Sequence, residues 1–382
     1  MRILATLVAS TLLAACASMP APPAGLLDDR LFAAPSQRIS ADDIFALSPE
    51  MRRYVGTDIA ADVRIKGPLQ GLFDALYSRD QLKLEYESSS TRNAQEAFAA
   101  RSGNCLSLVI MTAAFAKEMG LGVTYQHIYA DELWSRSGDV YLSIGHVNLT
   151  LSMRPSESTP RSYASDKLTI DFVPPSEVRG LRSRPIGEKT LVAMYMNNRA
   201  VESMIAERID DAYAWAREAI AQDPQFTVSY NTLGAVYHRH GNLAQSLTAL
   251  QYAHALEPKN PRVMSNLVAV LNALGQSAEA NRLSAELAQI EPYPPFVFFE
   301  RGIAAMRRGE YGVAKEMFAK EVARAPYYHE FHYWLAAALV NLGDYELARK
   351  HMLLALEGSL SRGEREIYAA KLDRINAYRS SR

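Results

Sequence analysis

The chain has 382 residues, with 41 lysines and arginines against 42 aspartates and glutamates, and its net charge is −1. Because the two signs are interspersed and no basic cluster is present, the composition argues against a nucleic-acid-binding protein or one with a phosphate-rich partner. The length is sufficient for two domains that each bury a core.

The first sixteen residues have the pattern of an export signal. Arg2 precedes an uninterrupted run of apolar and small residues, 3–15, which is too short to span a bilayer and has the length of a signal-peptide core. The run ends in "LAAC", whose last residue is Cys16, and this resembles the lipobox of bacterial lipoproteins. The resemblance implies cleavage before Cys16 and acylation there, and each acyl methylene contributes about 0.8 kcal/mol to membrane binding. A plain cleaved signal with an incidental cysteine is the alternative.

The segment after the signal predicts a tether. No aspartate follows Cys16, which resembles the outer-membrane sorting pattern and implies a lipid anchor in the outer membrane, facing the periplasm. Residues 17–40, which include the proline-rich stretch 19–25, are predicted to be an extended tether. No later segment has the about 20 apolar residues that a spanning helix needs.

Residues 41–186 predict an α+β domain. Apolar residues at helical spacing and the breaks between them predict helices at 41–53, 68–78, 91–101 and 105–119. Alternating or apolar runs predict strands at 82–87, 122–129, 139–151 and 167–173. A long buried helix followed by an antiparallel sheet is typical of the α+β class. The charged residues 179–189 predict a solvated connection to the next domain.

Cys105 is the residue with the most pronounced chemistry in this domain. The sequence contains two cysteines, so if Cys16 is lipidated, Cys105 has no partner for a disulfide and is either buried and inert or reactive. It follows a glycine and Asn104 at the amino end of a predicted helix, where the helix dipole favours a thiolate. A cysteine nucleophile also needs a base and a group that orients the base. His146 and Asp171, on neighbouring predicted strands, can lie side by side.

The motifs "GNCLSLVIMTAAFAKEMGLGV", "GHVNL" and "IDF" occur in this order, and together they resemble the transglutaminase-like superfamily of papain-type folds. The resemblance covers about residues 82–175. It implies that Cys105 is the nucleophile, His146 the general base and acid, and Asp171 the orienting carboxylate. It also implies an oxyanion hole formed by the Cys105 backbone N–H and a second donor, for which Gln95 and Asn104 are both candidates.

Other residues compete for these roles. His127 is an alternative base, although no carboxylate matches it, and Asp139 and Asp166 are the nearest substitutes for Asp171. Residues 152–167 are rich in proline, serine and charge and predict a long loop between the last two strands. A lone cysteine in a helix is more often a small buried hydrophobic residue than a nucleophile.

The second half of the chain, 187–360, contains an internal repeat. Glycine and proline each recur at a step of 34 residues, and so do two series of mostly small residues. Small residues let two helices of a hairpin cross closely, glycine ends the first helix, and proline ends the second. The four series are Gly241, Gly275, Gly309, Gly343; Pro224, Pro258, Pro292, Pro326; Ala200, Gly234, Val268, Gly302, Ala336; and Ala212, Ser246, Ala280, Ala314, Ala348.

This 34-residue period resembles the tetratricopeptide repeat, which implies about five helix–turn–helix units in an all-α solenoid. The third unit, 261–292, departs from the pattern, and residues 361–382 predict a polar capping helix. Such an array binds an extended peptide or a partner protein, or supports the other domain. His329 and His332 can share a helix face, but ordinary packing is favoured over metal binding.

The order of the parts suggests a function. A transglutaminase-like domain followed by tetratricopeptide repeats is similar to a group of bacterial lipoproteins. The resemblance implies a lipid-anchored cysteine hydrolase or acyl transferase that acts on peptide or amide bonds of a peptide or protein, while the repeats bind substrate or a cell-envelope protein. Water resolves the acyl-enzyme in a hydrolase, and an amine resolves it in a cross-linking enzyme.

Two other functions are weighed against this one. In the main alternative the protein is a catalytically inactive adaptor that scaffolds an envelope complex through its repeats. A redox role is disfavoured because a resolving cysteine is missing. No acidic loop has the ligand spacing of a calcium site, so neither a metal nor another cofactor is expected.

Overall fold

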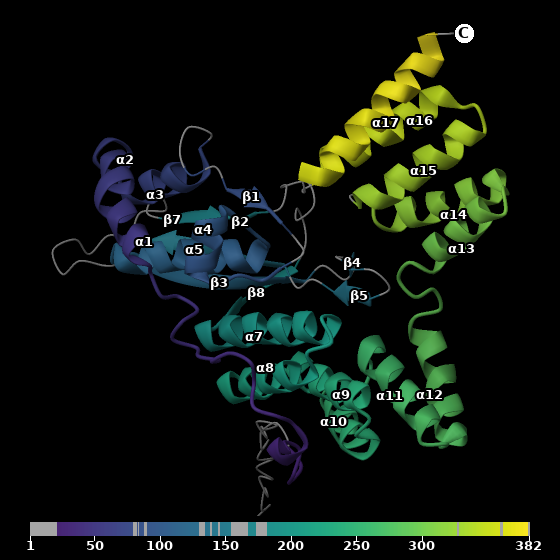
Figure 1. The fold of residues 1–382 in the computed structure, drawn as a ribbon, viewed down its shortest axis with the longest axis horizontal. Coiled ribbons are helices and arrows are strands. Elements are labelled where there is room, and N and C mark those ends of the chain that lie inside the picture. Colours follow the sequence, from purple (N-terminus) through teal and green to yellow (C-terminus); the bar gives the residue numbers. More distant parts are fainter. Residues whose placement is uncertain are drawn as a thin grey trace, which may run out of the picture.

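A computed structural model describes most of the chain (Figure 1). Residues 1–20, with Cys16 and the predicted export signal, lie outside the described residues, as do Asp139, Asp166 and most of the predicted loop 152–167. The described residues are 21–78, 82, 84–87, 90–129, 134–137, 140–143, 146–153, 167–172, 182–326, 328–359 and 362–380.

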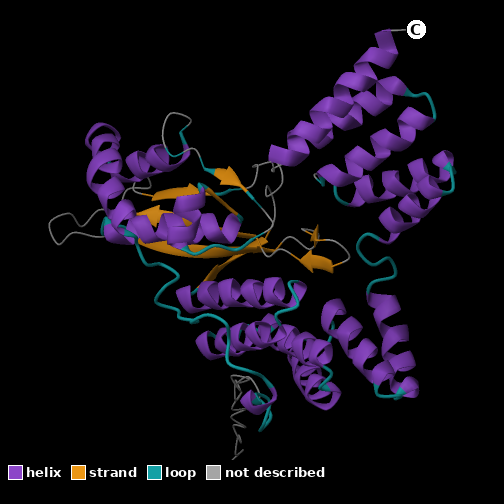
Figure 2. Ribbon diagram, in the orientation of Figure 1, coloured by secondary structure: helices purple, strands orange, loops and turns teal. Residues whose placement is uncertain are grey.

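An antiparallel sheet of four strands forms the centre of the first domain (Figure 2). The strand order is β7-β6-β3-β8. Ile128 pairs with His146 across the two central strands, and Leu149 pairs with Ile170. The strands are β3 (Gly122–Tyr129), β6 (His146–Ser152), β7 (Lys167–Ile170) and β8 (Arg182–Ile186).

Helices and short strands surround this sheet. The largest helix, α5 (Cys105–Glu118), packs against β6 and β3, and every residue from Cys105 to Ala116 is buried. The other helices are α1 (Pro49–Tyr54), α2 (Ala60–Lys66), α3 (Pro68–Tyr77) and α4 (Ala94–Ala100), with the π-helical turn η2 (Val55–Ile59) between α1 and α2. Two small pairs complete the domain: parallel β1 (Glu85–Tyr86) with β2 (Ser102–Gly103), and antiparallel β4 (Trp134–Ser137) with β5 (Val140–Ser143).

Several predictions for this domain differ from the structure, two of them for a clear local reason. The helix predicted over 41–53 is confined to α1, because the Ser48 side chain accepts the N–H of Met51 as an N-cap and Pro49 suits the first helical position. The charged stretch 179–189, predicted to be a connection, contains β8. This strand lies at the edge of the sheet and exposes most of its side chains, so it lacks the apolar alternation that identifies a strand.

The second half is an all-α solenoid of helix pairs, as predicted (Figure 1). In each pair the two helices pack against each other, and α17 (Arg362–Ser380) packs on the last pair. The pairs are α7 (Glu188–Ile205) with α8 (Ile209–Gln222), α9 (Val228–His240) with α10 (Leu243–Leu256), α11 (Pro261–Ala273) with α12 (Ser277–Ile290), α13 (Val297–Arg307) with α14 (Tyr311–Arg324), and α15 (His329–Asn341) with α16 (Tyr345–Gly358).

The periodic glycines have two separate roles. A methyl group on Gly234 would lie 2.5 Å from Leu250 Cγ, and one on Gly302 would lie 2.5 Å from a ring carbon of Phe318, so these positions allow close helix crossing. Gly241, which ends α9, has a φ of +90°, in the left-handed region that favours glycine.

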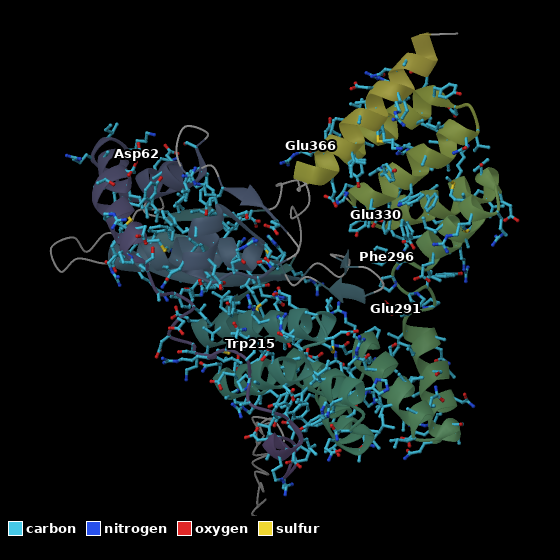
Figure 3. All side chains as sticks on the ribbon, in the orientation of Figure 1. Asp62, Trp215, Glu291, Phe296, Glu330 and Glu366 are labelled. Atoms are coloured by element: carbon cyan, nitrogen blue, oxygen red, sulfur yellow. The ribbon has the colours of Figure 1, made fainter. Side chains whose placement is uncertain are left out.

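The described residues form three hydrophobic clusters, and the first is continuous from the first domain into the solenoid. This cluster joins Leu149 of the sheet to Met196 of α7 and continues to Val263. A small second cluster lies between α10, α11 and α12. A third begins at Phe296, labelled in Figure 3, and covers α13 to α17. The segment "EPYPPF" (291–296) joins α12 to α13. The third unit, where the sequence repeat is irregular, therefore has a small cluster shared with α10, and neither this cluster nor the first extends across the segment.

Part of the predicted tether is fastened to the solenoid. Phe32 stacks on the Tyr213 ring with the centroids 3.9 Å apart, and the Tyr213 hydroxyl donates to Asp29 at 2.8 Å. The Ser36 hydroxyl donates to Asp211 at 2.7 Å, and the Tyr237 hydroxyl donates to the Leu26 carbonyl at 3.0 Å. Residues 26–36 thus lie along the first two helix pairs. Among the helices that the structure describes, none is long and apolar enough to cross a membrane.

Candidate active site

The N-cap at the start of α5 determines the position of Cys105. Asn104 has an extended backbone, and its Oδ1 accepts the N–H of Ser107 at 2.9 Å and the Ser107 hydroxyl at 2.8 Å. A Cβ on Gly103 would lie 2.6 Å from Ser107 Cβ, so the first turn of α5 packs directly on this glycine. The sequence Gly-Asn-Cys therefore supplies a small residue, a helix cap and then the thiol at the amino end of the helix.

His146 and Asp171 come together as the strand prediction required. His146 begins β6, and Asp171 directly follows β7, whose Ile170 pairs with Leu149. His146 Nε2 lies 2.6 Å from Asp171 Oδ1. The Cys105 thiol is the second group that interacts with this imidazole and raises its pKa. Because Asp171 occupies Nε2, the ring nitrogen left for the thiol is Nδ1.

Asn148 belongs to this site, although the sequence analysis gave it no role. Its Nδ2 donates to Asp171 Oδ2 at 3.0 Å, so His146 and Asn148 together engage both oxygens of the carboxylate. Asn148 is 6% exposed. Residues two apart on a strand share a face, so the spacing His-x-Asn within "GHVNL" is a signal that could have identified it.

The charge state of the site follows from these contacts. Burial by itself lowers the pKa of His146, but the hydrogen bonds and charges of Asp171 and Cys105 outweigh burial and raise the pKa to about 10. The imidazole is therefore protonated at neutral pH and lies between an acid and a thiol. For His127, burial and the charges of Arg184 and His146 act together and lower the pKa to about 4. His127 is therefore neutral at the same pH.

The site is closed. Cys105 is 2% exposed and His146 is 1% exposed, whereas the side chain of Asp171 is 19% exposed. The thiol and the imidazole are therefore buried, and the carboxylate is partly exposed.

The two candidate oxyanion donors differ in their surroundings. The Asn104 side chain is committed to other groups, because its Nδ2 donates to Thr91 Oγ1 at 2.9 Å while its Oδ1 caps α5. Gln95 is half-buried in the first turn of α4, which a capping box of Asn93 and Glu96 begins. The backbone N–H of Cys105 stands at the amino end of α5.

The histidines in the solenoid take part in packing contacts. His329 Nδ1 lies 2.9 Å from the Tyr368 hydroxyl, and His332 lies between Nδ1 of His351 at 2.9 Å and the Pro326 carbonyl at 2.7 Å. Within the described part of the chain, no group of three or more histidine, cysteine, aspartate or glutamate side chains is arranged to hold a metal ion.

Comparison with known proteins gives matches to solved structures over part of the chain. No protein-family model and no curated protein matches the chain. Among solved structures, PilF of Pseudomonas aeruginosa is 19% identical with a TM-score of 0.30, covering 51% of this chain and 88% of that one. MamA from Desulfovibrio magneticus RS-1 is 19% identical with a TM-score of 0.25, covering 40% and 85%. YrrB, described as a TPR protein with an unusual peptide-binding site, is 18% identical with a TM-score of 0.26, covering 47% and 92%. These low similarities concern the fold and not a function.

Proposed function

We propose that the protein is a cysteine hydrolase or acyl transferase that acts on peptide or amide bonds, with Cys105 as nucleophile, His146 as base and acid, and Asp171 as the orienting carboxylate. The observation that carries the proposal is the single imidazole that contacts Asp171 at 2.6 Å through Nε2 and also interacts with the Cys105 thiol, which raises the imidazole pKa. A nucleophile, its base and a group that orients the base form the constellation that covalent acyl transfer needs.

The reaction follows from these contacts. The Cys105 thiolate attacks the carbonyl carbon, a sulfur–carbon bond forms, and the carbonyl π electrons move onto oxygen. The N–H groups at the amino end of α5 face the developing negative charge. Collapse of this intermediate breaks the carbon–nitrogen bond, and the His146 imidazolium gives its proton to the leaving amine. Water or a second amine, deprotonated by His146, then releases the acyl group from sulfur.

Asp171 and Asn148 serve this cycle by holding the imidazole. With Asp171 on Nε2 and Asn148 on the other carboxylate oxygen, ring rotation is restricted and Nδ1 stays directed at the thiol. Asp171 also stabilises the imidazolium that exists before attack and after each proton uptake.

The solenoid has a separate role in this proposal, which is to bind a protein or peptide. Arrays of helix hairpins create extended concave surfaces suited to such ligands. The first two helix pairs of the solenoid share one hydrophobic cluster with the first domain. A ligand bound to these repeats would therefore be held close to the Cys105 site. The signal-like residues 1–16 support a further part of the proposal, that Cys16 carries a lipid anchor in the outer membrane, facing the periplasm.

The burial of the site favours a second candidate function. Because Cys105 and His146 are almost fully covered, the protein can also be an adaptor that uses its repeats to assemble an envelope complex and performs no acyl transfer. In that case the thiol is a buried hydrophobic group, and the polar contacts around it are structural.

The state of the thiol separates the two functions. In a full-length Cys16→Ala variant Cys105 is the sole cysteine, so ultraviolet thiolate absorbance, minus that of the Cys105→Ser version, reports on this residue alone. An enzyme is expected to keep the thiolate well below the ordinary thiol pKa of about 8.5 and to lose it in His146→Ala and Asp171→Ala. Ordinary titration that is indifferent to His146 would support the adaptor.

A further inference from the structure

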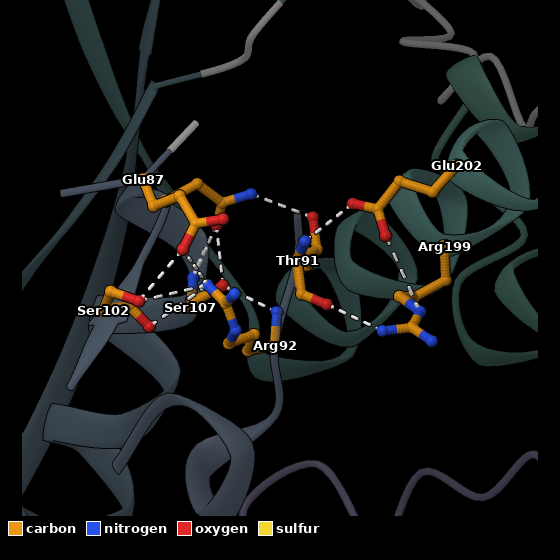
Figure 4. A network of polar contacts seen from close by, with 8 residues as sticks. Glu87, Thr91, Arg92, Ser102, Ser107, Arg199 and Glu202 are labelled. Atoms are coloured by element: carbon orange, nitrogen blue, oxygen red, sulfur yellow. Dashed lines mark hydrogen bonds and ion pairs between the residues drawn. The ribbon is translucent and has the colours of Figure 1, made fainter. Parts of the chain in front are cut away.

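A polar network connects α7, the first helix of the solenoid, to the first domain (Figure 4). Thr91, which is 1% exposed, lies at its centre. The Thr91 N–H donates to Glu202 Oε1 at 2.7 Å, and Arg199 Nη1 donates to the Thr91 carbonyl at 2.9 Å. Asn198 Nδ2 donates to the Thr91 hydroxyl at 3.3 Å. Three side chains of α7 therefore hold one buried residue of the other domain.

The same threonine contacts the cap of the helix that carries the nucleophile. Asn104 Nδ2 donates to Thr91 Oγ1 at 2.9 Å, and Asn104 Oδ1 accepts from Ser107 in the first turn of α5. The next residue along, Arg92, donates its backbone N–H to the Ser107 hydroxyl at 2.8 Å. Residues 91 and 92 thus hold the cap from two sides, immediately beside Cys105.

Charged groups of the solenoid and of the first domain hold residues 91 and 92 in place. On the solenoid side, Glu202 Oε2 lies 3.8 Å from Arg199 Nε. On the other side, Arg92 pairs with Glu87 at 2.8 Å, and the Ser102 hydroxyl donates to the same carboxylate at 3.0 Å. Without Glu202, the buried N–H of Thr91 would lose its acceptor, which a folded protein tolerates poorly.

We propose that α7 is a positioning element of the cysteine site and that Glu202 is its principal positioning residue, acting through Thr91 and Asn104. This inference rests on the proposed function, because the group that is positioned is the Cys105 nucleophile. Glu202 fixes Thr91, the Thr91 hydroxyl orients the Asn104 amide, and that amide fixes the first turn of α5 against His146. The first repeat is thus a working part of the catalytic site as well as a part of the solenoid.

The test uses the full-length Cys16→Ala chain and two readouts of Cys105, the thiolate titration and the rate of alkylation by iodoacetamide at about pH 6, below the ordinary thiol pKa. Glu202→Ala and Thr91→Val are each expected to shift the titration to higher pH and to slow alkylation about tenfold, since small displacements of reacting groups have effects of this size. Glu202→Gln keeps an acceptor for the Thr91 N–H and is expected to restore both readouts.

The matched control is Glu207→Ala, which removes an exposed carboxylate just beyond the end of α7 and should leave both readouts unchanged. Thermal unfolding of each variant identifies any loss caused by unfolding, and the nearly isosteric Thr91→Val keeps the test open if Glu202→Ala does not fold. If Cys105 is activated in the parent protein but its titration and alkylation rate are unchanged in Glu202→Ala, in Thr91→Val or in both, the positioning role is overturned. The proposed function is not affected by that result. A parent thiol that titrates ordinarily would instead refute the proposed function.

Discussion

At the scale of single residues, His146 couples the chemistry of the site to the stability of the fold. Its pKa is about 10 in the folded protein, against an ordinary value near 6.5, because Asp171 and Cys105 outweigh the effect of burial. A group with a raised pKa stabilises the folded state fully below its unfolded pKa, and this contribution is lost as pH rises through the folded pKa. The relevant window therefore runs from about 6.5 to about 10.

From this shift we predict that the free energy of unfolding falls between about pH 7 and pH 10, by at most about 1.4 kcal/mol per pH unit. His146→Gln should lack this part of the decline. Urea unfolding of the parent protein and of His146→Gln at a series of pH values measures the difference. Each of the two proteins is measured once with Cys105 and once with Cys105→Ser. Because tyrosines and lysines titrate alike in both proteins, the difference isolates His146, and parallel curves would contradict the assignment.

At the scale of elements, the solenoid depends on a few positions where a side chain does not fit. Gly302 of α13 faces Phe318 of α14, whose ring is fully buried and lies between Phe299 and Trp334. The 34-residue series of small residues thus records the places where two helices of a pair touch.

We predict that Gly302→Ala destabilises the last helix pairs by about 1–3 kcal/mol, the usual effect of overpacking. Gly312→Ala is the matched control, since no atom lies within 4 Å of the added methyl group and the residue is inside α14. It should stabilise the helix by about 0.5–1 kcal/mol, because alanine favours helices over glycine. Urea unfolding followed by Trp334 fluorescence compares the two, and equal effects would show that the crossing tolerates a side chain.

Elements with strong local signals were predictable, and those set by distant contacts were not. Helix α5 and strand β3 lie within one residue of their predicted bounds, because an apolar run and a glycine stop are local features. The predicted strand over 139–151 corresponds to two described strands, β5 and β6, and edge strand β8 has no alternation to detect.

The same distinction applies to the site. Cys105, His146 and Asp171 were identifiable because three short motifs occur in order. The bond from Thr91 to Glu202 joins residues 111 positions apart, and each has an ordinary local context. Only the packing of α7 against the first domain brings them together, so no pattern in the sequence indicates the pair.

At the scale of the whole molecule, separate hydrophobic clusters divide the chain. The first domain shares a cluster with the first helix pairs but not with the last ones. Trp215 belongs to the cluster that includes the sheet, whereas Trp334 packs against the cluster that begins at Phe296. The two clusters share no residue. The short proline-rich segment 291–296 connects α12 to α13.

We therefore predict two unfolding transitions. In a Trp134→Phe, Trp334→Phe variant the remaining Trp215 should report one midpoint in urea, and in a Trp134→Phe, Trp215→Phe variant Trp334 should report another. Gly302→Ala should move only the second midpoint, since its contacts lie in that cluster. A shift of both midpoints by the same amount would mean that the chain unfolds as one cooperative unit.

If Cys16 carries the proposed lipid anchor, the contacts of residues 26–36 with the first helix pairs limit the distance between the folded protein and the membrane. For a chain anchored at Cys16 as proposed, ten residues separate the anchor from Leu26, whose carbonyl accepts the Tyr237 hydroxyl (26 − 16 = 10). Fully extended, these ten residues span at most about 36 Å. A tether that was free to residue 40 would more than double that reach. A protein anchored in this way would stay within a thin layer next to the bilayer, and any ligand of its repeats or substrate of the proposed site would have to enter that layer.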